Sequence, residues 1–567
     1  MPAGNGAMII DLDDIALDGL PKYDLCIVGS GPAGATLAAE LVGSGLKICV
    51  LESGLKKTTR RGDLLREVVS EGIKIKEYSR ERVLGGASTT WAGLSSALDE
   101  IDMAERPWLE HAGWPISRKE LMPNWRAASE RYRFAPEDLY RPGGFGVLRG
   151  QGDWQPFWEA VEEKVFLACD EPQNFGREQR AVFESEGIDT YLDATVTELV
   201  RQGATRAIGA ARVRTRSGRE TLLRARVFVL ATGGIENARL LLASRDMCEQ
   251  GLGNEHGVVG RFLMNHPKNY CGILHLRRPV EQLPYFFGCL HQGYAGYAGL
   301  RFSAQQQTER GLLNSYVRLE PLFPWSDSQG IEALVLIVKR CAFVLRSWKS
   351  GRKDEVVELR DYSETGDDSD FQNERKTILS WIAALFAIVF DAKRVLSYLY
   401  WRLVAKKKPR IERVRLRNFM EMEPRPENRV ILGTDLDANG VPIPIVQHDT
   451  SSRDRRTLTE LHTALAEEFR ANDIGRLESD IATKDPWPIC QDASHHLGTT
   501  RMGQDPTTSV CDPLLRLHSV DNVYLAGGSV FPTSGCANPT FTIVALSIRL
   551  ARHLRNEVFQ PQTASHG

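Results

Sequence analysis

The chain has 567 residues, 42% of them hydrophobic and 25% charged, and its formal net charge is −2 at pH 7. This length exceeds what one hydrophobic core usually organises, and the composition is that of an ordinary globular protein, so we expect two domains. Because positive and negative charges nearly cancel, bulk electrostatics give no attraction for nucleic acid, and we expect no such partner.

The N-terminal residues 1–19 are acidic and lack the basic and apolar regions of a signal or transit peptide. The ten cysteines are scattered along the chain without a close CxxC pair. Two of them, Cys26 and Cys49, lie in apolar runs, where a thiol is usually buried and inert. We therefore expect no metal site, no disulfide framework and a cytoplasmic location.

Residues 23–54 predict a strand, a tight turn, a helix and a second strand. The segments LCIV at 25–28 and ICVLE at 48–52 are short apolar runs, typical of parallel strands that are buried on both faces. The same signal returns at 226–234 and at 522–530, each time before a helix-like segment. Because these units lie so far apart in the chain, they predict one nucleotide-binding domain assembled from distant segments, with a second domain inserted between them.

The first turn carries a glycine motif. Gly29, Gly31 and Gly34 form G-x-G-x-x-G between the strand and the helix, and Glu52 ends the next strand. Gly29 allows the tight turn, Gly31 lets the backbone approach a pyrophosphate, and Gly34 allows close packing of helix on strand. The helix N-terminus adds a positive dipole, and an acid about 20 residues further on accepts from ribose hydroxyls. The turn therefore indicates a dinucleotide site, but it does not distinguish NAD from FAD.

Two apolar-and-basic stretches, 331–353 and 378–410, predict a helical insertion at about 331–410. Charged residues interrupt both stretches, so neither keeps the ~20 apolar residues of a transmembrane span. Two interpretations stay open, namely helices that pack on protein with solvated basic ends, or a peripheral surface that lies in the membrane interface. The polar, acidic segment 361–376 between the stretches predicts an exposed loop.

Further motifs follow one another along the whole chain. They are RERVLGGASTTWAG, ERPWLEHAGWPIS, ATGGIENARLLLAS, GLGNEHGVVGRFLMNHP, MEPRPENRVILG, HHLGTTRMG and AGGSVFPTSGCANPTFT, which begin at residues 80, 105, 231, 251, 422, 495 and 526. In this order they resemble the glucose–methanol–choline (GMC) oxidoreductase family, most closely its pyranose-oxidase-like branch. The resemblance is weak only across about 141–180 and 280–410.

The resemblance implies a fold of two parts. The first is an α/β FAD-binding Rossmann-like domain, which is assembled from the discontinuous segments 18–110, 181–272 and 486–560. The second is an inserted α+β substrate-binding domain, formed by 111–180 and 273–485.

The resemblance also implies an active site for alcohol oxidation, which removes a hydroxyl proton and transfers a hydride to flavin N5. The family's base is the first histidine of an H-x-x-G-T motif, and the spacing from Gly498 favours His495. The alternative is His496, which stands where the family more often has proline. The second catalytic position is Asn538, whose amide donates to the substrate oxygen as negative charge develops.

The cofactor implied by the resemblance is FAD without a covalent link, because the family's covalent members have histidine at the position of Thr90. The loop at 85–88 is expected to lie against the pyrophosphate and the flavin, where small residues permit close approach. The backbone of Val196 is expected to meet the adenine. The complete set of expected cofactor contacts is Gly29, Gly31, Pro32, Ala33, Gly34, Glu52, Ser53, Arg82, Gly85, Gly86, Ser88, Thr90, Trp91, Ala92, Val196, Ala231, Gly233, Gly527, Gly528, Pro539 and Thr540.

The expected function is that of an FAD-dependent oxidoreductase that oxidises an alcohol, in particular a secondary hydroxyl of a sugar or glycoside. Dioxygen or a quinone is the expected electron acceptor. The alternatives are a dehydrogenase of a non-sugar alcohol that passes electrons to a quinone or a protein, and a lyase of the same family. A purely structural role is disfavoured because His495 and Asn538 are both present, whereas Asn265 and His266 are expected to be structural.

Overall fold

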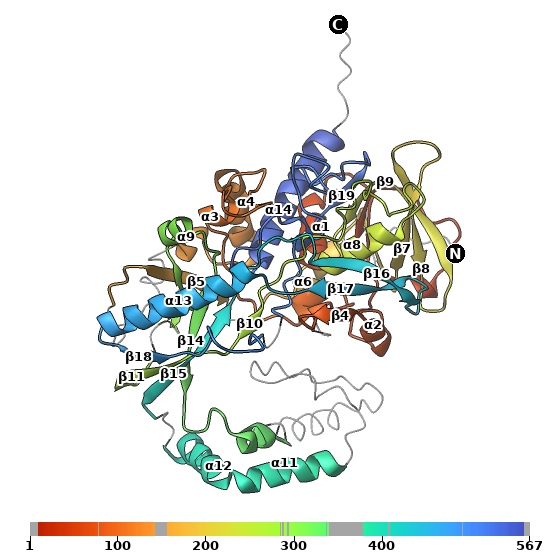
Figure 1. The fold of residues 1–567 in the computed structure, drawn as a ribbon. Helices are drawn as coiled ribbons and strands as arrows, with labels where there is room; N and C mark the ends of the chain where they lie inside the picture. Colours follow the sequence, from red (N-terminus) through yellow and green to blue (C-terminus); the bar gives the residue numbers. More distant parts are fainter. Residues whose placement is uncertain are drawn as a thin grey trace.

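The structure is a computed structural model that describes residues 9–560 except 77–78, 142–155, 170, 284, 286–288, 292–293, 336, 339–377, 406–408 and 490–491. These residues form two eight-stranded sheets, a smaller three-stranded sheet and the helices that cover them (Figure 1). The first large sheet is mostly parallel, and the second is antiparallel.

The first sheet contains every strand that the apolar runs predict. β2 (Tyr23–Val28) lies between β3 (Ile48–Leu51) and β9 (Glu220–Leu230) and pairs in parallel with both. β19 (Val523–Leu525), from the far end of the chain, pairs in parallel with β9. One domain is thus assembled from distant segments. The strand order is β1–β6–β3–β2–β9–β8–β7, completed by β1 (Ile9–Asp11), β6 (Ile188–Leu192), β7 (Thr195–Arg201) and β8 (Ile208–Arg214).

Helix α1 (Pro32–Leu41) follows β2 and packs against α14 (Thr540–His553), which in turn packs against α4 (Arg118–Tyr132). Glycine is required where α1 meets the turn before it, because a Cβ on Gly34 would lie 1.9 Å from the carbonyl oxygen of Gly29. Helix α8 (Gly234–Ala243) follows β9 in the same way, so two βα units present their turns at the same edge of the sheet.

The second large sheet has β13 (Tyr294–Phe302), β14 (Tyr316–Leu322) and β15 (Ile411–Phe419) at its centre. Helix α13 (Ser452–Ala471) lies along this sheet in Figure 1, and its His462 Nε2 is 2.8 Å from Asn418 Oδ1 of β15. The other strands are β5 (Val161–Cys169), β10 (Lys268–Asn269), β11 (Ile273–Val280), β12 (Cys289–His291) and β18 (Gly475–Glu478).

A three-stranded sheet links segments on both sides of the predicted domain boundary. β17 (Pro442–His448) pairs with β16 (Arg429–Leu436) and, in parallel, with β4 (Val69–Gly72). β16 also contacts α8. The division of the chain into two domains stays a prediction, and this pairing favours counting 429–448 with the FAD-binding part.

The predicted insertion contains α11 (Ile378–Phe390), α12 (Ala392–Leu399) and the short π-helix η6 (Tyr400–Ala405). In Figure 1, α11 and α12 extend along the lower edge of the molecule, away from both large sheets. Much of the predicted first stretch, the acidic loop and the lysines at 406–408 lie outside the described residues. None of the helices that the structure describes is both long and apolar enough to cross a membrane.

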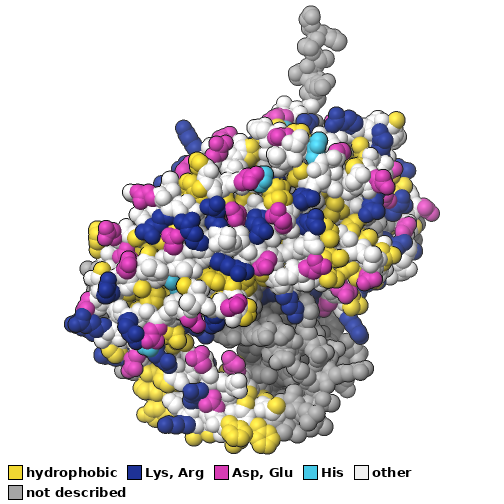
Figure 2. Space-filling model, in the orientation of Figure 1, with side chains coloured by type: hydrophobic (Ala, Val, Ile, Leu, Met, Phe, Trp, Pro, Cys, Tyr) yellow, Lys and Arg dark blue, Asp and Glu magenta, His cyan; other side chains and the backbone are white. Residues whose placement is uncertain are grey.

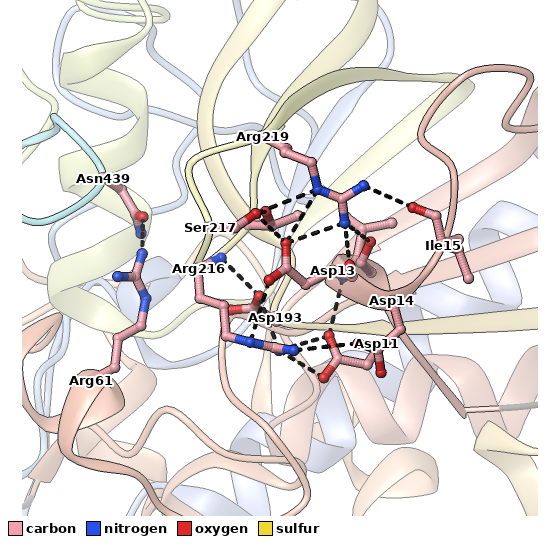
Figure 3. Close-up of polar contacts among 12 residues, drawn as sticks. Asp11, Asp13, Asp14, Ile15, Arg61, Asp193, Arg216, Ser217, Arg219 and Asn439 are labelled. Atoms are coloured by element: carbon pink, nitrogen blue, oxygen red, sulfur yellow. Dashed lines mark hydrogen bonds and ion pairs between the residues drawn. The ribbon is translucent and has the colours of Figure 1, made fainter.

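The acidic N-terminal segment is held by arginines of the loop between β8 and β9 (Figure 3). Arg216 Nη1 donates to both carboxylate oxygens of Asp11, at 2.8 and 2.7 Å, and lies 3.3 Å from Asp193 Oδ2. Arg219 Nη1 donates to the carbonyl of Ile15 at 3.0 Å. These contacts fix β1 along the edge of the first sheet, which covers part of an otherwise exposed strand edge.

A buried ion pair joins the segment before α4 to the end of β15. Arg106 donates through Nη1 and Nη2 to the two carboxylate oxygens of Glu421, at 2.9 and 2.6 Å. The exposed fractions of the two side chains are 1% and 0%. Two parallel hydrogen bonds of this kind offset much of the desolvation of both charges, but only while both partners are present.

We therefore expect Arg106→Met to lower the free energy of unfolding by about 3–5 kcal/mol, because it leaves the Glu421 carboxylate buried without its guanidinium. Chemical denaturation of the wild type and the variant measures this. The control is Arg277→Met, whose partner Asp473 and own side chain are mostly exposed, so that its loss should change the free energy of unfolding by less than about 1 kcal/mol. Equal effects of the two substitutions would contradict the prediction.

Candidate active site

A cavity of about 690 Å³ lies where the carboxyl ends of β2, β3 and β9 meet the second sheet. Ligands of open α/β sheets bind at this edge of the strands, and the volume is typical of a ligand pocket. At one end the cavity is lined by the turn after β2. At the other end it is lined by Tyr297 of β13, Arg318 of β14 and Phe419 of β15.

The glycine turn leaves room for a ligand at the N-terminus of α1. A Cβ on Gly29, whose φ is +101°, would lie 2.6 Å from the carbonyl oxygen of Ala231, so this glycine is required by the protein itself. A Cβ on Gly31 would meet no described atom within 4 Å, although Gly31 caps α1 and lines the cavity. Its open side is therefore ligand space, as expected where a pyrophosphate approaches a helix N-terminus.

Glu52 is fixed at the end of β3. Its Oε2 accepts from the backbone N and the Oγ of Ser30, at 3.2 and 2.6 Å, and its Oε1 accepts from Gly54 N at 2.8 Å. Burial raises the pKa of this carboxyl, and the hydrogen bonds from Ser30 and Gly54 oppose that shift. The carboxyl group lines the cavity in one orientation, which suits contact with ribose hydroxyls.

All but two of the predicted cofactor contacts line this cavity. The exceptions, Gly34 and Gly85, contact residues of the lining. Gly34 packs on Gly29, and Gly85 N donates to Ser30 Oγ at 3.0 Å. The sequence analysis missed Arg80 and Glu236, which form an ion pair at 2.6 Å within the lining. Glu236 follows the Gly-Gly of ATGGIEN at a helix start, a signal that could have identified it.

Two loops from distant parts of the chain bring His266 and His495 together. Met264 and Leu497 exchange backbone hydrogen bonds of 3.0 and 2.9 Å as an isolated antiparallel bridge. Asn265 Oδ1 accepts from His495 N at 3.0 Å. As a result, His266 Nδ1 lies 2.8 Å from His495 Nδ1, a partnership that the sequence analysis did not anticipate.

The carbonyl of Gly535 fixes the order of protons in this pair. His266 Nε2 lies 2.8 Å from that oxygen and must donate to it, because a carbonyl only accepts. Burial lowers the pKa of His266 to about 4, so its imidazole is neutral and its Nδ1 accepts. The proton between the rings therefore belongs to His495 Nδ1, and His495 Nε2 keeps a lone pair.

Asn538 and His496, the other polar side chains near His495, are also held by hydrogen bonds. His495 and Asn538 both line the cavity, and Asn538 Nδ2 donates to Leu94 O at 2.9 Å, which leaves its second N–H for a ligand. His496 Nε2 lies 3.3 Å from the buried carboxylate of Asp492. Burial, and next the repulsion that His266 would exert on a second protonated ring, lower the pKa of His495 well below its ordinary value, so this imidazole is neutral at pH 7.

The far end of the cavity is cationic and aromatic, which the sequence analysis also missed. Its lining includes Lys268, Arg318 and Arg417 together with Tyr297 and Phe419. The alternation of arginines along 413–417 is a strand pattern, but the sequence does not show which strands lie beside it.

Comparison with known proteins identifies the two parts of the chain. A family model described as FAD dependent oxidoreductase matches residues 24–253, and one described as GMC oxidoreductase matches residues 424–547. The chain is 23% identical to paromamine 6'-oxidase of Streptomyces fradiae, across 96% of this chain and 93% of that protein. It is 35% identical to C-glycoside 3-oxidase of Microbacterium trichothecenolyticum over 127 residues, which are 22% of this chain and 24% of the relative.

A solved structure shows the same fold. Pyridoxine 4-oxidase from Mesorbium loti matches with a TM-score of 0.55 and 16% identity, over 94% of this chain and 98% of that one. The predicted fold class is thereby confirmed. The turn and the glycine-lined cavity fit a dinucleotide, and the model that matches residues 24–253 identifies this cofactor as FAD. Residues 424–547 thus match a GMC oxidoreductase domain, and the chain is an FAD-dependent oxidoreductase that acts on CH–OH groups.

Proposed function

We propose that this enzyme oxidises a hydroxyl group of a sugar or glycoside to the carbonyl, with His495 as the base. The observation that carries the proposal is the proton order of the His266–His495 pair, which leaves His495 Nε2 as an acceptor in the FAD cavity. The names of the relatives, an oxidase of paromamine and an oxidase of C-glycosides, support this substrate class.

The residues of the cavity fit FAD as a tightly held but non-covalent cofactor. The pyrophosphate would lie against Gly31 and the N-terminus of α1, and Glu52 would contact the ribose. Thr90 lines the cavity at the position where a covalent link would require histidine. When bound, the flavin supplies the acceptor for the hydride that leaves the substrate carbon.

His495 would take the hydroxyl proton through Nε2. Its low pKa keeps the imidazole neutral, which is the form that acts as a base. His266 is a positioning residue in this scheme, because it accepts from His495 Nδ1 and so fixes both the tautomer and the direction of the ring. The same hydrogen bond strengthens when His495 becomes a cation.

Asn538 would stabilise the charge that develops on the substrate oxygen. Its Nδ2 is anchored to Leu94 O by one N–H, so the second N–H has a fixed direction. A donor that is already oriented stabilises an alkoxide-like oxygen without reorganising. His496 is held by Asp492 instead, which supports His495 rather than His496 as the base.

We propose that the enzyme works in the cytoplasm in peripheral contact with a membrane, and that a membrane quinone or dioxygen takes the electrons. Seven described cysteines are free thiols, as suits a reducing compartment. Large apolar side chains on α11, α12 and η6 are exposed, among them Val389 at 69% and Phe390 at 87%. Figure 2 shows hydrophobic side chains gathered at the lower edge of the molecule, where these helices lie.

The chemistry of this face fits an anionic bilayer. The 13 residues of α11 carry no charge, and a helix of this length, about 20 Å, is too short to cross the ~30 Å hydrocarbon core. Lys393, Arg394 and Arg402 lie exposed beside the apolar residues. An apolar face bordered by cations is typical of a helix that lies in the membrane interface.

The first prediction from the proposed function concerns the cofactor. The purified protein should be yellow and should release intact FAD on acid precipitation, because Thr90 cannot form a histidyl link. Gly31→Val should fold but lose FAD, since an added Cβ has no described protein atom within 4 Å and the side chain would enter the pyrophosphate space. Flavin absorbance and circular dichroism measure the two properties separately. Flavin that stays with the precipitated protein, or normal FAD content in Gly31→Val, would contradict the assignment.

The second prediction concerns the base. His495→Ala should keep FAD but slow anaerobic flavin reduction by roughly 10²–10⁴-fold, the range for loss of a general base. Asn538→Ala should also slow it. Because the pKa of His495 lies below 6.5, the wild-type rate should be constant around neutral pH and fall only as acid protonates the base. His496→Ala is the matched control, and a larger loss in that variant than in His495→Ala would refute the assignment.

The third prediction concerns the membrane. The holoenzyme should float with vesicles of anionic phospholipid at low salt and less with neutral vesicles or at high salt, because cations and apolar groups act together. Val389→Ser with Phe390→Ser should abolish flotation, since both side chains are mostly exposed. The control is Leu436→Ser, an equally apolar residue that is 59% exposed on β16. If the protein floats under none of these conditions, the apolar face of α11, α12 and η6 contacts protein and not a membrane.

A further inference from the structure

The hydrogen bond between His495 and His266 continues into the protein as a chain. The two Nδ1 atoms lie 2.8 Å apart, and His266 Nε2 lies 2.8 Å from the carbonyl oxygen of Gly535. The two rings cross at 80°, with their centroids 5.0 Å apart. Because imidazole has a nitrogen on either side of its ring, a proton accepted at one nitrogen can be balanced by a proton released at the other. The chain therefore leads from His495, in the cavity lining, to a carbonyl inside the protein.

Fixed segments of backbone hold this chain in one arrangement. Asn265 Oδ1 accepts from the backbone N of His266 at 2.8 Å and from that of His495 at 3.0 Å. Gly535 has a φ of +53°, and a Cβ there would lie 2.5 Å from Cγ of Asp102, so this position requires glycine. The acceptor at the end of the chain is thus held as firmly as the two rings.

The surroundings of His266 favour a proton on its ring. Burial lowers the pKa of His266 to about 4, and the Gly535 carbonyl and the Glu421 carboxylate oppose that shift. Glu421 stays ionised, because its buried ion pair with Arg106 holds the pKa of its carboxyl below the ordinary value against the effect of burial. A cation on His266 therefore has a carbonyl acceptor and a negative charge nearby.

The surroundings of His495 are less favourable to a cation. Burial again has the largest effect and lowers its pKa, and His266, His496 and Lys268 lower it further. Asp492 opposes these effects, but its carboxylate already accepts from the backbone N of Ser494 at 3.2 Å and lies 3.3 Å from His496 Nε2. Of the two rings, His266 is thus the better place for a positive charge.

We propose that His266 is the final acceptor of the substrate proton. The O–H bond of the substrate breaks and an N–H bond forms at His495 Nε2, while the N–H bond at His495 Nδ1 breaks and one forms at His266 Nδ1. His495 ends neutral in its other tautomer, and His266 ends as a cation that donates to His495 Nδ1 and Gly535 O. No electron moves in this transfer. The inference rests on the proposed function and deepens it, because that function gives His266 only a positioning task.

The transfer between the rings is feasible because both partners are imidazoles. In a Ser-His-Asp site the histidine keeps its proton, since a carboxylate is a much weaker base than an imidazole. No such difference separates His495 from His266. The transfer also moves the positive charge from the cavity lining to a ring that is only 2% exposed, where both N–H groups have acceptors in place.

An acid titration of the oxidised holoenzyme shows which ring takes the proton, without turnover. Histidine labelled with nitrogen-15 reports the protonation of each ring nitrogen by NMR, and His266→Asn and His495→Gln identify the two sets of signals. At neutral pH the protons should lie on His495 Nδ1 and His266 Nε2. As the pH falls, His266 should become the imidazolium first, because its surroundings favour the cation. A cation that forms first on His495 would overturn the proposal.

His266→Asn separates proton transfer from positioning. Its amide oxygen can accept from His495 Nδ1, but an amide does not take up a proton in this pH range. The variant should bind FAD and reduce it anaerobically roughly 10²-fold more slowly, the lower end of the range for loss of a general base. In mixtures of H₂O and D₂O, the wild-type rate should follow a curve in the deuterium fraction, because two protons move together. A wild-type rate without this curvature, or a variant as fast as the wild type, would overturn the proposal.

His462→Asn is the matched control. His462 is also buried, has hydrogen-bonding partners at 2.7 and 2.8 Å from its two ring nitrogens, and has its pKa lowered by burial to about 4. It lies outside the described cavity lining, so the variant should keep the wild-type rate and the same curved isotope dependence. Equal losses of rate in His266→Asn and His462→Asn would reduce His266 to a structural residue and so overturn the proposal.

The two assignments can fail separately. If His495→Ala is strongly impaired but His266→Asn reduces its flavin at the wild-type rate, this inference is wrong and the proposed base stands. If acid protonates His266 first but His495→Ala reduces its flavin like the wild type, the proposed function is wrong and the order of basicity in the pair stands.

Discussion

The short bridge between Met264 and Leu497 is the contact on which the active site depends. It joins the segment that enters the second sheet to the loop that returns to the first, so the two parts of the chain meet at one point. Asn265 reinforces the bridge by accepting from His495 N. Because His266 and His495 each lie two residues from a bridged residue, the bridge brings the two imidazoles within hydrogen-bonding distance.

Burial suits this histidine pair to the proposed role of a base. In water, neighbouring imidazoles would titrate near neutrality, and a positive charge on either would change the hydrogen bond between them. Here burial lowers the pKa of both rings, and no described carboxylate accepts a hydrogen bond from either one. The Gly535 carbonyl then decides which nitrogens carry protons, a role that an aspartate plays in many other histidine sites.

The cavity is polarised along its length. Its cofactor end combines the N-terminus of α1 with the ion pair of Arg80 and Glu236, and its substrate end presents Lys268, Arg318 and Arg417. The positive end of the α1 dipole suits the pyrophosphate of the cofactor. In the proposed function the reacting atoms would lie beside neutral groups, His495 and Asn538, where charge arises only during the reaction.

The sequence by itself determined the first domain and its cofactor turn, because glycines, buried parallel strands and helix starts leave local signals of fixed spacing. Gly29, Gly31 and Glu52 lie where those signals place them. Only the tertiary structure decided the partner of His266, the facing of Arg318 with Arg417, and the exposure of Phe390. Each of these depends on which distant segments lie side by side, and strand register and helix facing arise from packing that a local pattern does not encode.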